Sequence, residues 1–253
     1  MTNTKHPLGE YAKAYEIKDS FDKVRVSKPE AELTGLHRLD IQMEEMLRDR
    51  SEDCAEELLA GFKAINQYPK SVTVFGSART PESDIYYQKA RSISGKVCEE
   101  GFAIITGGGP GIMEAANRGS KEACGYSVGF NIVLPSEQVI NPYVTHGVDF
   151  KFFSPRKMAL FFSAEAYLYF PGGFGTLDEF FQLVTLIQTK KAPATPIVLV
   201  GKDFWEPIHE VIKSTLRDKF KTISPQDTNL YKITDDEDEI LNIVRNAPLR
   251  GSY

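Results

Sequence analysis

The feature that most constrains the fold is a repeated pattern: a short apolar run, a glycine-containing turn, then a helical period. The runs are apolar throughout, as expected for strands buried on both faces. They span residues 72–75, 102–106, 127–134, 148–153, 166–170 and 196–200. Alternation of such strands with helices predicts a three-layer α/β domain with a mainly parallel sheet and helices on both faces. The carboxyl ends of its strands meet at one edge, where ligands bind in this class.

The chain divides into three parts by pattern. Residues 1–30 are polar with no sustained period, which predicts an N-terminal arm. Apolar residues recur every three or four positions over residues 31–69, which predicts an N-terminal extension made of one or two helices. The α/β domain then occupies 70–253. Within it, Thr80-Pro81 and Ser154-Pro155 have the residue types that start helices.

Composition limits the function classes. The net charge of −5 argues against bulk binding to nucleic acid or to an anionic membrane. Three scattered cysteines without a CxxC pair, and no apolar stretch near the start, predict a reduced, cytoplasmic protein. With four histidines and those cysteines, we expect no metal site.

Two glycine-rich turns, 106–111 and 171–176, follow strands on the predicted ligand-binding edge. Glycine lets a backbone approach a ligand closely, and the first amides of the following helix have no partner. A phosphate fits such a helix N-terminus. Tight strand–helix packing alone also explains one such turn, but two on one edge favour phosphate. Neither turn matches a strict dinucleotide or Walker motif, because position 112 is Ile and no Lys-Ser/Thr pair follows the glycines.

Charged residues near these turns have two interpretations. Thr176 and Glu179 have the spacing of a capping box, yet a carboxylate there also suits a base or a cation stabiliser. The sequence leaves both open for Glu179. Arg156 and Lys157 are predicted in a first helical turn, where cations oppose the helix dipole and so indicate a bound anion. Arg79 lies on the same edge and permits the same argument.

Four segments occur in order: Gly76–Arg79, Gly107–Met113, Arg156-Lys157 and Pro171–Glu179, the last reading PGGFGTLDE. Over about residues 72–216, this strongly resembles the LOG ("Lonely Guy") family of nucleoside 5′-monophosphate phosphoribohydrolases, often labelled "possible lysine decarboxylase". The resemblance implies a Rossmann-like, nucleotide-binding catalytic domain and a homodimer. It implies hydrolysis of a nucleoside monophosphate, of the AMP or cytokinin riboside monophosphate type, to free base and ribose 5-phosphate, with no cofactor.

The resemblance also implies roles for residues. It assigns catalysis to Arg156 and Glu179, and the phosphate to Gly173, Gly175 and Thr176. Other contacts that it implies are Thr185 with the substrate, Ser77 and Met113 near the sugar and base, and Glu137 with the base. We further assign Arg79, Gly108, Gly109, Lys157, Gly172, Phe174 and Asp178 to substrate binding. One departure is Pro155 directly before the Arg-Lys pair, where many relatives have another residue.

Three other functions are possible for a chain with this pattern. Some relatives with this fold carry a phosphorylated cofactor, such as molybdenum cofactor, without catalysis; the Arg–Glu pair favours the enzyme. A dinucleotide oxidoreductase is disfavoured because the strict glycine fingerprint is absent. A pyridoxal-dependent decarboxylase needs a Schiff-base lysine in a dedicated site, and nothing in the sequence singles one out.

Overall fold

The computed structural model describes residues 37–123, 125–134 and 140–250. The predicted arm, 1–30, lies outside these residues. Helix α2 (His37–Ile65) is one continuous helix of 29 residues rather than two. Two compact units are distinguished, one containing the described residues up to Glu52 and the other spanning Asp53–Arg250. The sheet and everything discussed below belong to the second unit.

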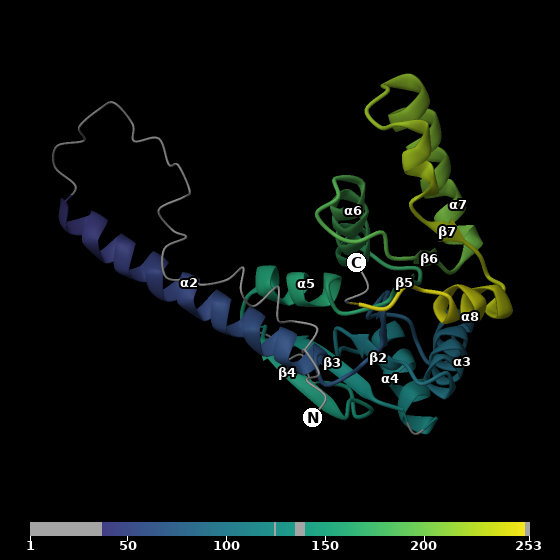
Figure 1. Cartoon of the computed structure of the whole chain (residues 1–253), viewed down its shortest axis with the longest axis horizontal. Helices are drawn as coiled ribbons and strands as arrows, with labels where there is room; N and C mark the ends of the chain where they lie inside the picture. The colour runs from purple at the N-terminus through teal and green to yellow at the C-terminus, as the bar shows by residue number, and fades with distance from the viewer. Residues whose placement is uncertain (1–36, 124, 135–139, 251–253) are drawn as a thin grey trace, which may run out of the picture. The chain divides into compact units, whose positions relative to one another are not determined.

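Seven strands form a single, entirely parallel sheet in the order β4-β3-β2-β1-β5-β6-β7 (Figure 1). The strands are β1 (Ser71–Phe75), β2 (Ala103–Thr106), β3 (Ser127–Ile132), β4 (His146–Phe150), β5 (Ala166–Tyr169), β6 (Ile197–Leu199) and β7 (Lys232–Ile233). The prediction of a Rossmann-like α/β fold is confirmed, and β7 is a strand that the sequence did not predict. The strand order reverses between β1 and β5, so the crevice typical of such sheets lies at their carboxyl ends.

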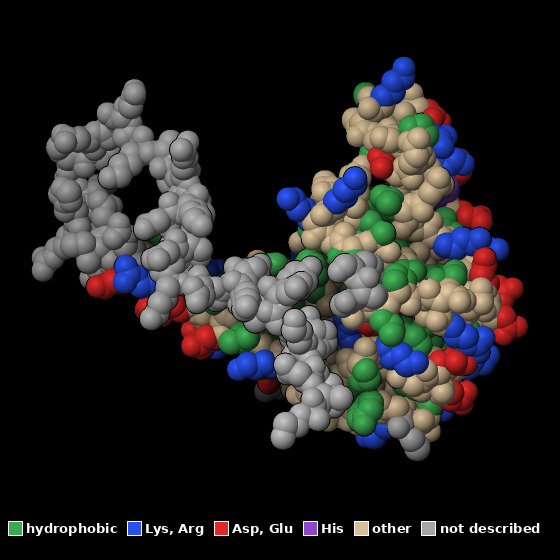
Figure 2. Space-filling view, in the orientation of Figure 1, with side chains coloured by type: hydrophobic (Ala, Val, Ile, Leu, Met, Phe, Trp, Pro, Cys, Tyr) green, Lys and Arg blue, Asp and Glu red, His purple; other side chains and the backbone are tan. Residues whose placement is uncertain are grey.

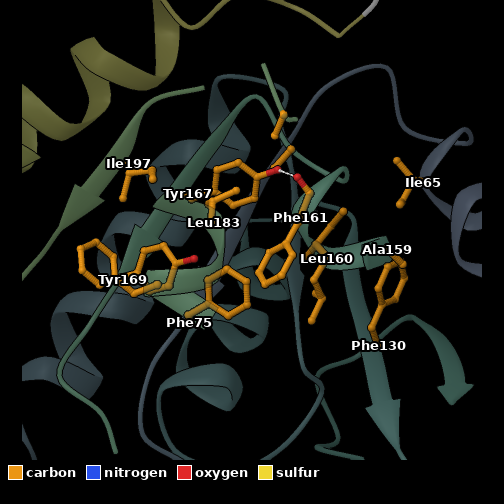
Figure 3. Close-up of a cluster of buried hydrophobic side chains, with 14 of the residues drawn as sticks. Ile65, Phe75, Phe130, Ala159, Leu160, Phe161, Tyr167, Tyr169, Leu183 and Ile197 are labelled. Carbon is orange, nitrogen blue, oxygen red and sulfur yellow. Dashed lines mark hydrogen bonds between the residues drawn. The ribbon is translucent and has the colours of Figure 1, made fainter. Parts of the chain in front are cut away.

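Helices cover both faces of the sheet. They are α3 (Ile85–Glu99), α4 (Ile112–Glu122), α5 (Phe153–Phe161), α6 (Phe174–Gln188), α7 (Lys202–Val211), the π-helix η2 (Ile212–Lys219), the 3-10 helix η3 (Pro225–Asn229) and α8 (Glu237–Arg245). One core lies between the sheet and α5, α6 and α7, and a second lies between the sheet and α3, α4 and α8. Figure 3 shows the first core, in which the rings of Phe75 and Tyr169 stack with centroids 4.7 Å apart. Because this pair ends the two central strands, aromatic packing reaches the base of the crevice.

Two helix starts differ from prediction. Helix α3 begins at Ile85 with Asp84 as its cap, because the Asp84 carboxylate accepts the Tyr86 amide at 2.7 Å. Thr80-Pro81 instead precedes a turn in which the Asp84 amide donates to Pro81 O at 3.0 Å. Helix α5 begins at Phe153, one residue before the predicted Ser154. Arg156 is therefore the fourth helical residue, where a charge interacts less with the helix dipole.

A buried ion pair fastens the amino-terminal edge of the sheet. The Glu165 side chain is fully buried, accepts the Ser71 amide at 2.6 Å, and pairs with Arg250 Nε at 2.8 Å. The Arg250 guanidinium also donates to Ser163 O at 2.6 Å and to Tyr68 O at 2.8 Å. This cluster connects the starts of β1 and β5 to the last described residue of the chain.

Charges on the outer surface of α3 and α8 are mixed in sign (Figure 2). Lys96 pairs with Glu237 at 2.6 Å and Arg245 pairs with Glu100 at 2.6 Å. Such alternation gives no single-sign field over this face. Among the described helices, none has the length and apolarity needed to cross a membrane.

Candidate functional site

The turn between β5 and α6 presents an open helix N-terminus. Gly173 is the N-cap of α6, and no side chain caps the helix. The amides of Phe174, Gly175 and Thr176 therefore lack a partner among the described residues. A Cβ added at Gly173 or Gly175 would meet nothing within 4 Å. Free amides facing open space at a helix N-terminus form a site for an anion.

Thr176 is part of this turn but does not cap the helix. It is the third residue of α6, so of the two interpretations that the sequence left open for Glu179, a capping box with Thr176 does not fit the structure. The cap position belongs to Gly173, which has no side chain to offer. A Cβ at Gly172 would lie 2.2 Å from Thr176 Oγ1, so the hydroxyl packs directly against the turn. Helix capping therefore does not explain why a glutamate occupies position 179.

The first glycine-rich turn is packed rather than open. Gly107, Gly108 and Gly109 are buried. The Ile112 amide, first in α4, donates to Ser77 O at 3.0 Å, and a Cβ at Gly111 would lie 2.3 Å from that same oxygen. Tight packing, the alternative considered from the sequence, therefore describes this turn, in contrast to the second.

A buried network of polar side chains holds the first turn in place. Asn141 Nδ2 donates to Gly108 O at 3.1 Å and to Gly109 O at 3.0 Å. It also lies 2.9 Å from Asn117 Oδ1, which accepts the Thr106 hydroxyl at 2.6 Å. Sequence reasoning missed Asn117 and Asn141. The available signal was an asparagine at position 117, directly after the apolar pair Ala115-Ala116.

Arg156 reaches the same turn from the opposite face of the sheet. It is only 7% exposed, and its Nε donates to Phe130 O at 2.6 Å. Its Nη2 lies 3.4 Å from Gly107 O, and a Cβ at Gly107 would lie 2.3 Å from Nη2 and 2.8 Å from Met113 Sδ. Arg156, Gly107 and Met113 are thus brought together. Burial lowers the pKa of the guanidinium, while Glu179 opposes that shift.

Glu179 is the titratable group at the centre of the site. Desolvation raises the pKa of its carboxyl from 4.5 to about 7, although Arg156 and Lys157 act to lower it. Its side chain makes no hydrogen bond or ion pair within 4.0 Å with any described residue. The backbone of Glu179 is held in place by β5, because the buried Tyr169 hydroxyl donates to Glu179 O at 3.2 Å. A carboxyl poised near neutral pH with a buried guanidinium nearby is an arrangement suited to proton transfer or cation stabilisation.

Ser77 joins the two turns through its backbone. Its amide donates to Pro171 O at 3.0 Å, and its carbonyl accepts the Ile112 amide at 3.0 Å. The side chain of the neighbouring Arg79 is exposed at the same edge. Ser77 and Arg79 therefore lie where the sequence placed them, beside the crevice between β1 and β5.

The remaining predicted residues lie along α6 and α5. Lys157 and Asp178 form an ion pair that bridges the two helices. Phe174 is 92% exposed at the start of α6. Thr185 is not brought to the turn: it lies nine residues beyond Thr176, about 13 Å along the helix axis. It lines a shallow groove with Asp178, Phe181, Gln182 and Leu186. Glu137 lies outside the described residues.

Within the described part of the chain, no three His, Cys, Asp or Glu side chains gather closely enough to hold a metal ion. The groups that converge at the crevice are instead the free amides of α6, the Arg156 guanidinium and the Glu179 carboxyl.

Comparison with known proteins gives a family and a fold. An uncharacterized protein of Archaeoglobus fulgidus is 24% identical over 153 residues, which cover 59% of this chain and 97% of that protein. A molybdenum cofactor carrier protein of Chlamydomonas reinhardtii is similar in structure, with a TM-score of 0.52 and 22% identity over 70% of this chain and 97% of that one. The molybdenum cofactor binding protein of Rippkaea orientalis gives a TM-score of 0.50 and 18% identity, over 70% and 96% of the two chains. At these identities the similarity shows the fold alone.

The family model described as "possible lysine decarboxylase" matches residues 113–244, more than half of the chain. That segment contains Arg156, the open turn at α6 and Glu179. The chain therefore belongs to the "possible lysine decarboxylase" family, which is the LOG family.

Proposed function

We propose that this protein hydrolyses the N-glycosidic bond of a nucleoside 5′-monophosphate, of the AMP or cytokinin riboside monophosphate type, releasing the free base and ribose 5-phosphate. The observation that carries the proposal is the pairing of an open anion site with a carboxyl of raised pKa on one helix. The free amides belong to residues 174–176, and Glu179 follows within one turn. Helical side chains tilt toward the N-terminus, which directs Glu179 toward the bound phosphate end of the substrate.

The proposed mechanism follows the charges that develop on the sugar. The 5′-phosphate binds the α6 amides and so fixes C1′ near Glu179. As the C1′–N bond breaks, C1′ acquires oxocarbenium character. Glu179 as a carboxylate stabilises that cation and takes a proton from water, whose oxygen bonds to C1′. Arg156 orients the substrate. The proton that Glu179 takes from water passes to the departing base, so that the base leaves neutral and Glu179 returns to its carboxylate.

The proposal includes a cytoplasmic homodimer. Its support is the outer face of α6 and α5, where Phe174, Phe181 and Met158 are 92%, 41% and 44% exposed. Thr185, distant from the turn of its own chain, belongs to this face. Light scattering after size exclusion should give twice the chain mass, and Phe181→Glu should return it to a monomer. A monomeric wild type would remove the dimer from the proposal.

The enzymatic test is incubation with a panel of nucleoside monophosphates, with free base measured by chromatography. Glu179→Gln keeps the shape and removes the charge, so we expect loss of at least a hundredfold in kcat with an unchanged fold. Glu206→Gln, an exposed glutamate on α7, is the matched control and should keep full activity. Full activity of Glu179→Gln, or of Arg156→Ala, would exclude that residue from the mechanism.

The second candidate is a carrier of a phosphorylated cofactor such as molybdenum cofactor. The observation that favours it is the fold that this chain shares with the two molybdenum cofactor proteins. A carrier needs the anion site at α6 but has no need of a carboxyl with a pKa of about 7. Tight binding of such a cofactor, together with no free base from any nucleoside monophosphate, would favour the carrier.

A further inference from the structure

Glu57, a half-buried residue of α2, binds the chain just before α5 with its carboxylate. Glu57 Oε1 accepts the Lys151 amide at 2.9 Å, and Glu57 Oε2 accepts the Phe152 amide at 3.2 Å. Lys151 and Phe152 form the whole connection between β4, which ends at Phe150, and α5, which begins at Phe153. One side chain from a distant part of the sequence therefore fixes the path by which the chain enters α5.

The same face of α2 contacts this segment at two more points. Asp53, Glu57 and Gly61 are spaced by four residues, so they lie along one side of the helix. Asp53 Oδ2 lies 3.7 Å from Lys151 Nζ, and a Cβ on Gly61 would lie 2.7 Å from Ala159 Cβ. All five residues belong to the second compact unit. Because Ala159 is part of α5, α2 contacts both the entry to that helix and its second half.

The start of α5 has no side-chain cap of its own. The helix has nine residues, and the side chain at its cap position, Phe152, makes no capping hydrogen bond. A helix of this length depends on tertiary contacts for its stability. The Glu57 carboxylate lies at its N-terminus, where a negative charge interacts favourably with the helix dipole. The sequence indicated an anion near Arg156 and Lys157, and the structure has this carboxylate at the start of their helix.

The position of Arg156 depends on where α5 lies. Arg156 is the fourth residue of the helix, and its buried guanidinium donates to two backbone carbonyls, those of Phe130 and Gly107. Among the described residues, no carboxylate lies within 4.0 Å of it to form an ion pair. A displacement of the start of α5 would therefore move the guanidinium, with no charged partner to retain it.

We infer that Glu57 is a positioning residue: by holding the connection between β4 and α5, its carboxylate sets the place of the Arg156 guanidinium in the crevice. For its effect on hydrolysis, this inference rests on the proposed function. The placement of Arg156 can be measured without any substrate, because the guanidinium lowers the pKa of Glu179.

The test measures the pKa of Glu179 by carbon NMR of the full chain with isotopically labelled glutamate carboxyls. The signal is assigned by its loss in Glu179→Gln. Glu57→Ala removes both acceptor oxygens, so Arg156 should move away and the pKa of Glu179 should rise from about 7 by about 0.5 or more. Loss of a negative charge would by itself lower the pKa of another carboxyl, so the sign separates positioning from a direct charge effect. An unchanged or lowered pKa would overturn the inference.

Two control variants lie on the same helix. Asp53→Ala removes a negative charge whose ion pair with Lys151 is solvent-exposed, and Glu56→Ala changes the exposed glutamate beside Glu57. Neither residue binds the amides before α5, so the pKa of Glu179 should not rise in either protein. A rise as large as that in Glu57→Ala would overturn the inference.

A double variant tests whether Glu57 acts through Arg156. In an Arg156→Met protein the charge to be positioned is gone, so adding Glu57→Ala should not raise the pKa of Glu179 further. The same rise in that background would overturn the inference, because Glu57 would then act by another route. If Glu57→Ala does not fold, Glu57→Gln replaces it: this variant keeps one acceptor oxygen and should change the pKa in the same direction.

Hydrolysis provides a separate measurement. With AMP as substrate, Glu57→Ala should lower kcat/KM on the order of tenfold, since a misplaced group near the reacting atoms loses much of its effect. A kcat/KM equal to that of the wild type would overturn the part of Glu57 in the reaction. If the wild type releases no base from any nucleoside monophosphate, the hydrolase proposal falls, while the titration of Glu179 still decides whether Glu57 positions Arg156.

Discussion

Replacing Glu179 by Gln should make the protein more stable at pH 8, while activity is lost. The carboxyl is poorly solvated and has no hydrogen-bond or ion-pair partner among the described residues, so folding raises its pKa from 4.5 to about 7. A carboxyl whose pKa is raised by folding contributes stability below pH 4.5 and loses it as the pH rises through 7. Glutamine has the shape of the protonated form and escapes that loss.

The size of the effect follows from the shift. At 1.36 kcal/mol per pKa unit, the shift from 4.5 to about 7 corresponds to about 3 kcal/mol. Glu179 is partly exposed, so solvent screening reduces the gain to on the order of 1–3 kcal/mol. The gain should be complete above pH 7 and should vanish near pH 4.5.

Urea unfolding at pH 4.5, 6 and 8, at one protein concentration, measures this difference. Glu206→Gln makes the same chemical change at an exposed site and should alter the free energy of unfolding by less than about 0.5 kcal/mol. A Glu179→Gln protein that is less stable at every pH would refute the reasoning. That result would mean that the carboxylate stabilises the fold, as a cap or an ion pair would.

Three other outcomes are expected. Lys157→Met removes a cation that lowers the pKa of Glu179, so the acid limb of kcat/KM should move to higher pH; pH–rate profiles check this, and an unmoved limb contradicts it. Gly173→Ala adds a methyl group that has no protein atom within 4 Å, so the melting temperature should not change. The methyl group occupies the space in front of the α6 amides, so calorimetry should show phosphate binding weakened about tenfold or more. Unchanged phosphate affinity would mean that the anion binds elsewhere. Arg250→Ala leaves the Glu165 charge buried and unpaired, which should lower the free energy of unfolding in urea by about 3–5 kcal/mol. A decrease below about 1 kcal/mol would contradict a stabilising role for the Glu165–Arg250 ion pair.

Most of the sheet could be predicted because its strands are buried on both faces. The run 166–170, for example, contains all of β5. Strand β7 could not be predicted in this way, since Lys232 and Ile233 are only two residues and not fully buried. It is a strand because β6 is present to pair with it. The sequence of residues 232–233 alone does not indicate that a neighbouring strand is available to pair with them.

The helix starts and the site geometry could not be predicted from local sequence, because they depend on contacts with residues elsewhere in the chain. Thr80 has the chemistry of a cap, but Asp84 takes that role because the chain makes one more turn first. The two glycine-rich turns look equivalent in sequence. The first is packed because the Ser77 carbonyl, the Asn141 amide and the Arg156 guanidinium contact it, whereas the first amides of α6 have no partner among the described residues. Asn141 belongs to the site through contacts with residues more than thirty positions away.

The peptide groups on either side of Ser77 have a consequence for protein engineering. The Ser77 amide donates to Pro171 O and the Ser77 carbonyl accepts from the Ile112 amide, so this residue connects the start of α4 to the turn before α6. A chimera with a homologue joined at residue 77 would disturb both glycine-rich turns at once, the packed turn before α4 and the open turn before α6. A junction at the exposed residues Lys190 and Lys191, after α6, leaves both hydrogen bonds of Ser77 intact and is the better place to build chimeras.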